Sequence, residues 1–147
     1  MSDGLSADQI RAFLSDPDQA PPATKFLGVE IVDIDVEGAR IEIRSQGRPE
    51  LCNPNGSVQG GIVSAYLDEA MSLALLIGLR FSAAVPTLEM KTSYLRPLIE
   101  GPFRFEGSVT RAGKSVGFTE GRAYDAKGRL CAIATATAAI KRGDPSA

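Results

Sequence analysis

A chain of 147 residues, of which 44% are hydrophobic and 23% charged, has the size and composition of one ordinary globular domain. Its net charge of −2 creates no overall positive field, so we expect no nucleic-acid partner. The chain contains no histidine, which excludes Ser-His-Asp and Cys-His catalysis and histidine-ligated metal sites. Any general base is therefore expected to be a carboxylate, and we expect no metal centre.

The sequence predicts a cytoplasmic protein with no membrane partner. The first residues, MSDGLSADQIRAF, lack the basic region and the following apolar core of a secretory signal. The longest apolar stretch is interrupted by Asp68 and Glu69, which argues against a membrane span. Cys52 and Cys131 are far apart and match no metal-binding spacing, so we expect two small buried or half-buried residues without a disulfide.

The N-terminal third predicts a short helix, a linker and a hairpin. Ser6 and Gln9 form a capping-box pattern for a helix over residues 7–15, and several prolines after it predict a linker. From residue 29 the hydrophobic pattern alternates, and Glu37-Gly38 predicts a turn between two strands. The buried face of this hairpin is expected to hold Val32, Ile34, Val36, Ile41 and Ile43.

The rest of the chain predicts one buried helix and four strands. After a loop over 46–57, apolar residues from Ile62 to Ile77 are spaced for a helix that is apolar on nearly every side, and Gly78 is expected to end it. Strands are predicted over 87–95, 103–111, 115–124 and 129–140. The third of these has one face of small residues, which lets a helix approach closely: Gly117, Thr119, Gly121 and Ala123.

The order of elements predicts an α+β protein with the hotdog fold. A short N-terminal helix precedes the order β-β-α-β-β-β-β, and an all-round apolar helix needs cover on every side. A curved antiparallel sheet wrapped around the helix gives most of that cover, and a second copy of the chain is expected to supply the rest. We expect a helix and linker over 1–25, the hotdog domain over 26–142 and a frayed tail over 143–147.

Asp68 is the strongest candidate for a catalytic group. A carboxylate in the middle of an apolar helix is costly unless it is paired, hydrogen-bonded or exposed in a cleft. Ser64, Asp68 and Ser72 recur every four residues and form one polar stripe, whereas Glu69 points about 100° away. The alternative is that both carboxylates mark a solvated helix face. A second possibility is one functional carboxylate and one on the surface or at a subunit contact.

The segment before the helix favours a catalytic role. Residues 53–61 read Asn-Pro-Asn-Gly-Ser-Val-Gln-Gly-Gly and lead straight into it. Glycines at a helix start expose amide donors at the positive end of the helix dipole. Such donors suit the oxyanion that forms when a thioester carbonyl is attacked, and a carboxylate two turns along the helix could supply or activate the attacking oxygen.

These residues, with the stretch from Thr87 to Pro97 that ends in Tyr-Leu-Arg-Pro, resemble the PaaI-like hotdog thioesterases. The family pattern is N-x-x-G-x-x-H-G-G-x-x-x-x-L-x-D, followed by a strand ending in Y-L-R-P. The similarity spans about residues 26–141. Two positions depart from it: Tyr66 replaces the leucine, and Gln59 replaces the histidine before the two glycines. Glutamine can still donate a hydrogen bond near the carbonyl.

The resemblance implies a role for each matching residue. Asp68 corresponds to the catalytic carboxylate, acting as general base or as nucleophile. The backbone N–H of Gly60 polarises the thioester carbonyl, and Asn53 helps to position the thioester or the water. Thr87, or alternatively Ser72, supplies a hydroxyl that orients the water. In this family the site spans a dimer interface, with Asn53 and Gly60 facing Asp68 and Thr87 of the other subunit.

The resemblance also implies an acyl-CoA substrate, no separate cofactor, and a homodimer that pairs into a dimer of dimers. Candidates for contacting coenzyme A are basic residues near strand ends, with solvated surface charge as the alternative for each, together with one glycine in a basic turn. They are Lys91, Arg96, Arg111, Gly113 and Lys114. The competing hypothesis is a non-catalytic acyl-CoA-binding or sensor protein. Hotdog dehydratases of the Asp/His type are disfavoured because the chain has no histidine.

Overall fold

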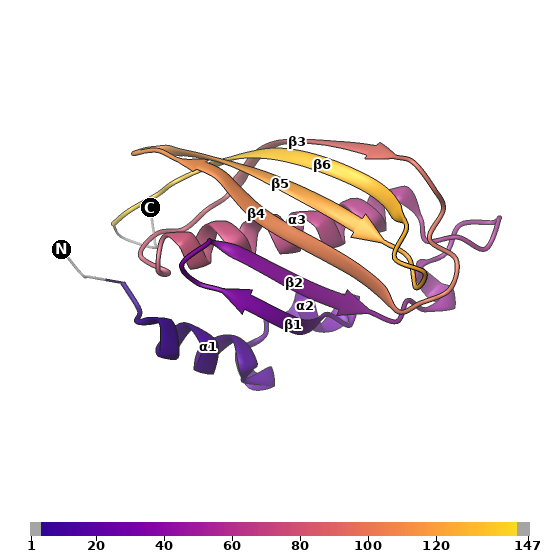
Figure 1. Ribbon diagram of the computed structural model, residues 1–147, viewed down its shortest axis with the longest axis horizontal. Helices are drawn as coiled ribbons and strands as arrows, with labels where there is room; N and C mark the ends of the chain where they lie inside the picture. Colours follow the sequence, from indigo (N-terminus) through magenta and orange to yellow (C-terminus); the bar gives the residue numbers. More distant parts are fainter. Residues whose placement is uncertain (1–3, 144–147) are drawn as a thin grey trace.

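A 19-residue helix, α3 (Gly60–Gly78), lies inside the concave face of a six-stranded antiparallel sheet (Figure 1). This computed structural model describes residues 4–143, and the strands run in the order β1-β2-β4-β5-β6-β3. The strands are β1 (Glu30–Asp35), β2 (Arg40–Ser45), β3 (Thr87–Tyr94), β4 (Phe103–Ala112), β5 (Val116–Tyr124) and β6 (Leu130–Ala139). The predicted hotdog arrangement is therefore confirmed.

The sheet approaches α3 closely because small residues line its inner face. A Cβ at Gly107 on β4 would clash with the carbonyl oxygen of Ala70, and one at Gly117 on β5 would lie 2.7 Å from the Leu75 side chain. On β5 the buried positions alternate as predicted, and they are the small residues. The glycines thus fix the depth at which α3 sits and, with it, the position of every side chain on the helix.

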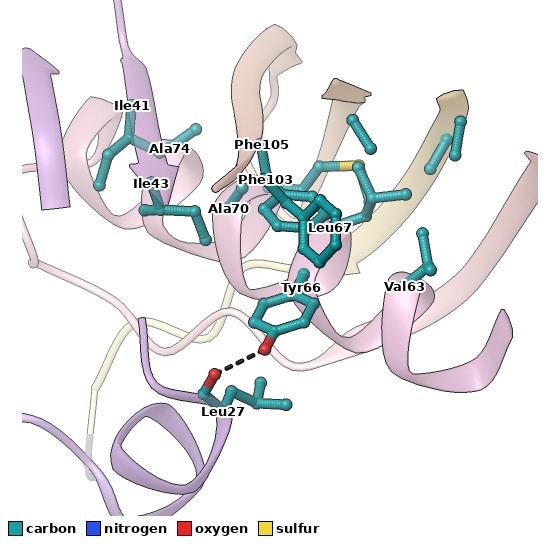
Figure 2. Packing of buried hydrophobic residues seen from close by; sticks show 14 of the residues in the cluster. Leu27, Ile41, Ile43, Val63, Tyr66, Leu67, Ala70, Ala74, Phe103 and Phe105 are labelled. Carbon is teal, nitrogen blue, oxygen red and sulfur yellow. Dashed lines mark hydrogen bonds between the residues drawn. The ribbon is translucent and has the colours of Figure 1, made fainter. Parts of the chain in front are cut away.

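The face of α3 that carries Tyr66 is anchored by a buried hydroxyl. The Tyr66 ring is fully buried and stacks on Phe105 with 4.6 Å between ring centroids. Its hydroxyl donates to the carbonyl oxygen of Leu27 at 2.6 Å (Figure 2). The same hydroxyl lies 2.8 Å from Ser45 Oγ. By length and composition α3 would also suit a membrane span, but eight of its side chains are buried inside the fold, as expected of a core helix. The cytoplasmic location stays a prediction.

The N-terminal segment contains more helix than its prolines suggest. Helix α1 (Ala7–Ser15) begins with the predicted capping box. The predicted linker is wrong, because it contains a 3-10 helix, η1 (Pro17–Gln19), and a second helix, α2 (Pro22–Leu27). Pro17 and Pro22 each stand at the first position of these helices, where the missing N–H costs nothing. The predicted domain boundary after residue 25 therefore falls inside α2.

The hairpin also differs from its predicted register. The pairing of β1 with β2 shifts between Ile31 and Asp33, so Val32 is an extra residue in a β-bulge. Val32 is 49% exposed instead of facing the core, whereas Ile41 and Ile43 are buried as predicted. The predicted loop over 46–57 holds a short 3-10 helix, η2 (Pro49–Leu51). The other strands match prediction within one residue at each end, and most of the predicted tail lies outside the described residues.

Candidate active site

Asp68 is half-buried on α3 and accepts a hydrogen bond from a threonine on the edge strand β3. The Thr87 hydroxyl donates to Asp68 Oδ1 at 2.8 Å. Between residues 4 and 143 this is the hydroxyl that contacts Asp68, and the alternative, Ser72, makes no such bond. Thr87 is exposed, so the pair lies where solvent or a ligand can reach it.

Thr87 faces α3 because of a β-bulge. Along β3 the partly buried residues Met90 and Thr92 alternate with the exposed residues Glu89 and Lys91. Regular alternation would place Thr87 on the exposed face with Glu89. The pairing of β3 with β6 shifts between Thr87 and Glu89, because β3 has one extra residue there. This β-bulge turns Thr87 toward the helix.

Glu69, the next residue, has a contact of its own inside the chain. Thr24 on α2 donates from its hydroxyl to Glu69 Oε1 at 2.6 Å, and Thr24 is buried. Glu69 is half-buried, and this hydrogen bond joins α2 to α3, so the expectation that it lies on the surface or at a subunit contact stays a prediction. The two neighbouring carboxylates thus serve different parts of the molecule.

The first turn of α3 is built as a donor site. Gln59 is the N-cap residue, its side chain is exposed, and it makes no capping hydrogen bond. Gly60 and Gly61 follow, and amides in the first turn have no acceptor within their own helix. The segment is held by its backbone, since Gln59 N–H donates to the Leu51 carbonyl oxygen at 2.8 Å. Free amides at the positive end of the dipole suit a developing negative charge.

Asn53 organises the loop that precedes the helix. Its Oδ1 accepts from the backbone N–H of Asn55 at 3.0 Å and of Ser57 at 3.3 Å. Its Nδ2 donates to Ser57 Oγ at 2.9 Å. The side-chain nitrogen of asparagine carries two protons, so one N–H of Asn53 Nδ2 remains for a ligand.

Asn53 and Gly60 line the same cavity, which has a volume of about 270 Å³. Tyr94 and Arg96 also line it, and its apolar wall includes Val63, Leu98 and Cys131. Burial raises the pKa of the Cys131 thiol, so this group is protonated near neutral pH and is a poor nucleophile. A larger cavity of about 880 Å³ lies between α1, α2 and β1 and contains none of the predicted catalytic residues.

One chain carries two separate groups of predicted catalytic residues. Gly60 and Asp68 are eight residues apart on α3, which corresponds to about 12 Å along a helix. Asn53 and Gly60 lie together at the cavity, whereas Asp68 and Thr87 form a pair further along α3. A thioester carbonyl held at Gly60 is therefore out of reach of Asp68 of the same chain.

The predicted coenzyme A contacts do not form one cluster. Arg96 lies at the cavity with Gly60, and its Nη1 donates to the Leu130 carbonyl oxygen at 2.9 Å. Lys91 is exposed on β3 near Arg122. The remaining predicted contacts, which lie in or beside the β4–β5 turn, are Arg111, Gly113 and Lys114. Consecutive turns between antiparallel strands alternate between the two ends of a sheet, so this turn is at the end opposite to Arg96. Arg142, which no sequence pattern indicated, donates to the Lys114 carbonyl oxygen at 2.6 Å.

A group of hydroxyls beside Gly60 was also not predicted. Ser64 Oγ lies 2.9 Å from Thr92 Oγ1 and 2.6 Å from the Tyr94 hydroxyl, which donates to the Gly60 carbonyl oxygen at 2.9 Å. The signal for it was present in the sequence: Ser64 belongs to the polar stripe of α3, and Thr92 and Tyr94 alternate onto one face of β3.

Known proteins resemble this chain along most of its length. Residues 55–132 match the family model described as the thioesterase superfamily. A candidate esterase of Saccharolobus solfataricus is 32% identical over 127 residues, which is 86% of this chain and 89% of the relative. The crystal structure of a candidate thioesterase from Ralstonia eutropha, a phenylacetic acid degradation-related protein, has 32% identity and a TM-score of 0.79, covering 89% of this chain and 98% of the other. A thioesterase family protein from Silicibacter pomeroyi has 29% identity and a TM-score of 0.80, with coverage of 91% and 99%.

Proposed function

Because the chain belongs to the thioesterase superfamily, we propose that it hydrolyses an acyl-CoA thioester to a free acid and coenzyme A. The observation that carries the proposal is the Asp68 carboxylate on a largely apolar helix, hydrogen-bonded by Thr87 at 2.8 Å at an accessible edge of the sheet. No histidine competes with it for the role of base. A carboxylate is then the group left to activate water or to attack the thioester.

Two routes fit this carboxylate. As a general base, Asp68 takes a proton from water while the water oxygen attacks the thioester carbon. When the tetrahedral intermediate collapses, the C–S bond breaks and Asp68 returns the proton to the departing thiolate. As a nucleophile, Asp68 attacks the thioester carbon, and the C–S bond breaks to leave a mixed anhydride and the thiolate. Water then hydrolyses the anhydride, which restores the Asp68 carboxylate and releases the acid together with the proton that the thiolate takes up. In both routes the Thr87 hydroxyl holds Oδ1, which leaves Oδ2 to act.

The oxyanion of the intermediate would be stabilised at the start of α3. The Gly60 N–H is the proposed donor, and Asn53, which lines the same cavity, would help to hold the thioester. The distance of about 12 Å between Gly60 and Asp68 along α3 supports a site shared between two chains. We therefore propose a homodimer in which each site combines Asn53 and Gly60 of one subunit with Asp68 and Thr87 of the other, with a dimer of dimers as the larger assembly.

For the phosphates of coenzyme A, Arg96 is the leading candidate because it lines the cavity next to Gly60. Lys91, Arg111, Gly113 and Lys114 lie outside this cavity. They would contact the same substrate if a partner subunit brings them to it. Surface charge with no ligand contact is the alternative for each of them.

The test is a hydrolysis panel. Purified protein is incubated with aryl, short-chain and long-chain acyl-CoAs, and release of both the free thiol and the free acid is measured. Oxygen esters of the same acids form a control, because they keep the acyl group and replace the thiol leaving group by an alcohol. The proposal expects at least one acyl-CoA to be hydrolysed with a higher kcat/KM than its oxygen ester. Absence of thiol release across the panel would exclude it.

The second candidate is a protein that binds acyl-CoA without cleaving it, and Gln59 in place of the family histidine is the observation that favours it. Gln59 is exposed and makes no capping hydrogen bond, so its side chain is available to a ligand. Calorimetry that detects acyl-CoA binding in the absence of thiol release would support this alternative. Under the hydrolase proposal, Gln59→Ala impairs turnover without abolishing it.

A further inference from the structure

A line of three hydroxyl groups, two from β3 and one from α3 itself, ends at the first turn of α3. Thr92, Ser64 and Tyr94 follow one another at hydrogen-bonding distances of 2.9 and 2.6 Å, and the line ends 2.9 Å from the Gly60 carbonyl oxygen. The Tyr94 ring also covers Gly60, since a Cβ at that glycine would lie 3.4 Å from the ring. Tyr94 thus contacts the glycine that carries the proposed oxyanion donor.

The direction of these hydrogen bonds follows from the last acceptor. A carbonyl oxygen only accepts, so the single proton of Tyr94 is donated to Gly60. Tyr94 must then accept from Ser64, and Ser64 in turn must accept from Thr92. The three hydroxyls therefore form a chain with one polarity, and each donor is strengthened by the bond that it accepts.

The carbonyl at the end of this chain belongs to the same peptide group as the Gly61 N–H. Resonance couples the two ends of a peptide, so a hydrogen bond at the oxygen draws electron density from the nitrogen and makes the N–H a better donor. Gly61 is exposed, and among the described residues its N–H donates to no backbone carbonyl, so its amide is open to a ligand.

We propose that Tyr94 is a positioning residue that orients and polarises the Gly60–Gly61 peptide, so that the Gly61 N–H joins the Gly60 N–H in stabilising the oxyanion. The role in catalysis rests on the proposed hydrolase function. Ser64 and Thr92 support Tyr94, and neither is expected to touch the substrate. Amides of consecutive residues in a first turn commonly bind one anion together.

The polarisation is tested without substrate. In Tyr94→Phe the ring stays and only the hydroxyl is lost, and the Gly61 amide proton is followed by ¹H–¹⁵N NMR. We expect this proton to move upfield, by more than any amide in the second half of α3. The matched control is Tyr124→Phe, which removes a tyrosine hydroxyl bonded to Glu106 on β4. An unmoved Gly61 amide in Tyr94→Phe, or an equal shift in the control, would overturn the proposal.

Kinetics test the consequence for turnover. Tyr94→Phe is expected to lower kcat about tenfold with KM unchanged, which is less than the ~10²–10³-fold loss on removing an oxyanion donor outright. Ser64→Ala should cost less than Tyr94→Phe, and the double variant should be no slower than Tyr94→Phe because the hydroxyls act as a unit. A raised KM at unchanged kcat, or losses that multiply in the double variant, would overturn the positioning role.

The two measurements separate this inference from the hydrolase proposal. A shifted Gly61 amide in a protein that cleaves no acyl-CoA would support the polarised peptide and remove the hydrolase function and, with it, the catalytic role. Wild-type hydrolysis that is unaffected by Tyr94→Phe, together with an unmoved amide, would keep the function and remove Tyr94 from it.

Discussion

Two consecutive carboxylates on α3 each accept a hydrogen bond from a threonine hydroxyl, but one threonine is exposed and the other is buried. Asp68 accepts a hydroxyl hydrogen bond from Thr87 at 2.8 Å, and Glu69 accepts one from Thr24 at 2.6 Å. Thr24 is buried on α2, whereas Thr87 is exposed on the edge strand β3. A threonine–carboxylate contact is therefore no sign of catalysis by itself.

The difference lies in what each threonine belongs to. Thr24 belongs to α2, which packs over α3 and is held there by a second bond, from Tyr66 to the Leu27 carbonyl oxygen. The Glu69 pair thus joins two parts of one chain. The Asp68 pair lies beside a strand that has a neighbour on one side only, so its other side is open to a substrate or to a second copy of the chain. We infer a structural role for Glu69 and a chemical role for Asp68.

The largest effect is expected from Asp68→Asn. The amide is nearly isosteric but cannot act as base or nucleophile, so turnover should fall at least about a hundredfold. The melting temperature should stay near that of the wild type, because the Asn Oδ1 can still accept the Thr87 hydroxyl. Steady-state hydrolysis of the best acyl-CoA and a thermal melt measure both quantities.

Glu69→Gln is the matched control on the neighbouring residue. It removes the same charge and keeps an oxygen for the Thr24 hydroxyl, so turnover should remain close to the wild-type rate. A folded Asp68→Asn protein with near-normal turnover, or a Glu69→Gln protein with an equal loss, would reverse the assignment of the two carboxylates.

Subunit mixing asks whether Asp68 works with a partner chain, in contrast to Glu69, whose contact is made within its own chain. Asp68→Asn and Asn53→Ala are each expected to be folded and inactive. In a heterodimer of the two, one shared site carries both changes and the other carries neither. Activity should therefore return to at most half of the wild-type level in the heterodimer.

Native mass spectrometry provides the control for this mixing experiment, because it shows whether subunits have exchanged. Demonstrated exchange with no return of activity means that each chain holds its own complete site. The separation of about 12 Å between Gly60 and Asp68 along α3 would then have to be closed by a conformational change.

The parts of the fold that follow from hydrophobic periodicity were predictable. The all-round apolar pattern of α3 and the alternation in β4, β5 and β6 gave their boundaries within two residues, because the burial that drives folding also sets those periods. Positions at β-bulges were not predictable. Val32 and Thr87 each lie where one extra residue shifts the pairing, and the shift depends on the partner strand.

The site was predictable only in part, because some of its contacts depend on elements that are distant in the sequence. Asp68 stands out locally as a carboxylate in an apolar helix, and Gly60 as a glycine at a helix start. The Asp68–Thr87 contact joins residues 19 apart, and the role expected for Thr87 rests on a family resemblance rather than on spacing. The polar stripe of α3 and the alternation of β3 place Ser64 and Tyr94 on definite faces of their elements, but the contact between them spans 30 residues and depends on how β3 packs against α3.

A smaller loss of activity is expected from Thr87→Val. Valine keeps the shape of threonine but cannot donate to Asp68, so the carboxylate is less well oriented and kcat should fall about tenfold, within the range for a hydrogen bond to a charged group. Stability should change little, because Thr87 is exposed. Unchanged kcat would show that the Thr87 hydroxyl is not needed to orient Asp68, and Ser72 would become the residue to test.

The smallest effect on activity is expected from Thr24→Val. It is the same substitution as Thr87→Val, made in the threonine that donates to Glu69. Losing the buried hydroxyl leaves Glu69 Oε1 without its bond to α2, which should lower the free energy of unfolding by about 1–3 kcal/mol. For a domain of this size each kcal/mol corresponds to roughly 2–4 °C in melting temperature. Turnover measured well below the melting temperature should stay within about twofold of wild type, because α2 contains none of the proposed catalytic residues. If Thr24→Val instead lowers kcat as much as Thr87→Val at unchanged stability, then the Glu69 pair acts in the reaction and the two carboxylates share the chemistry.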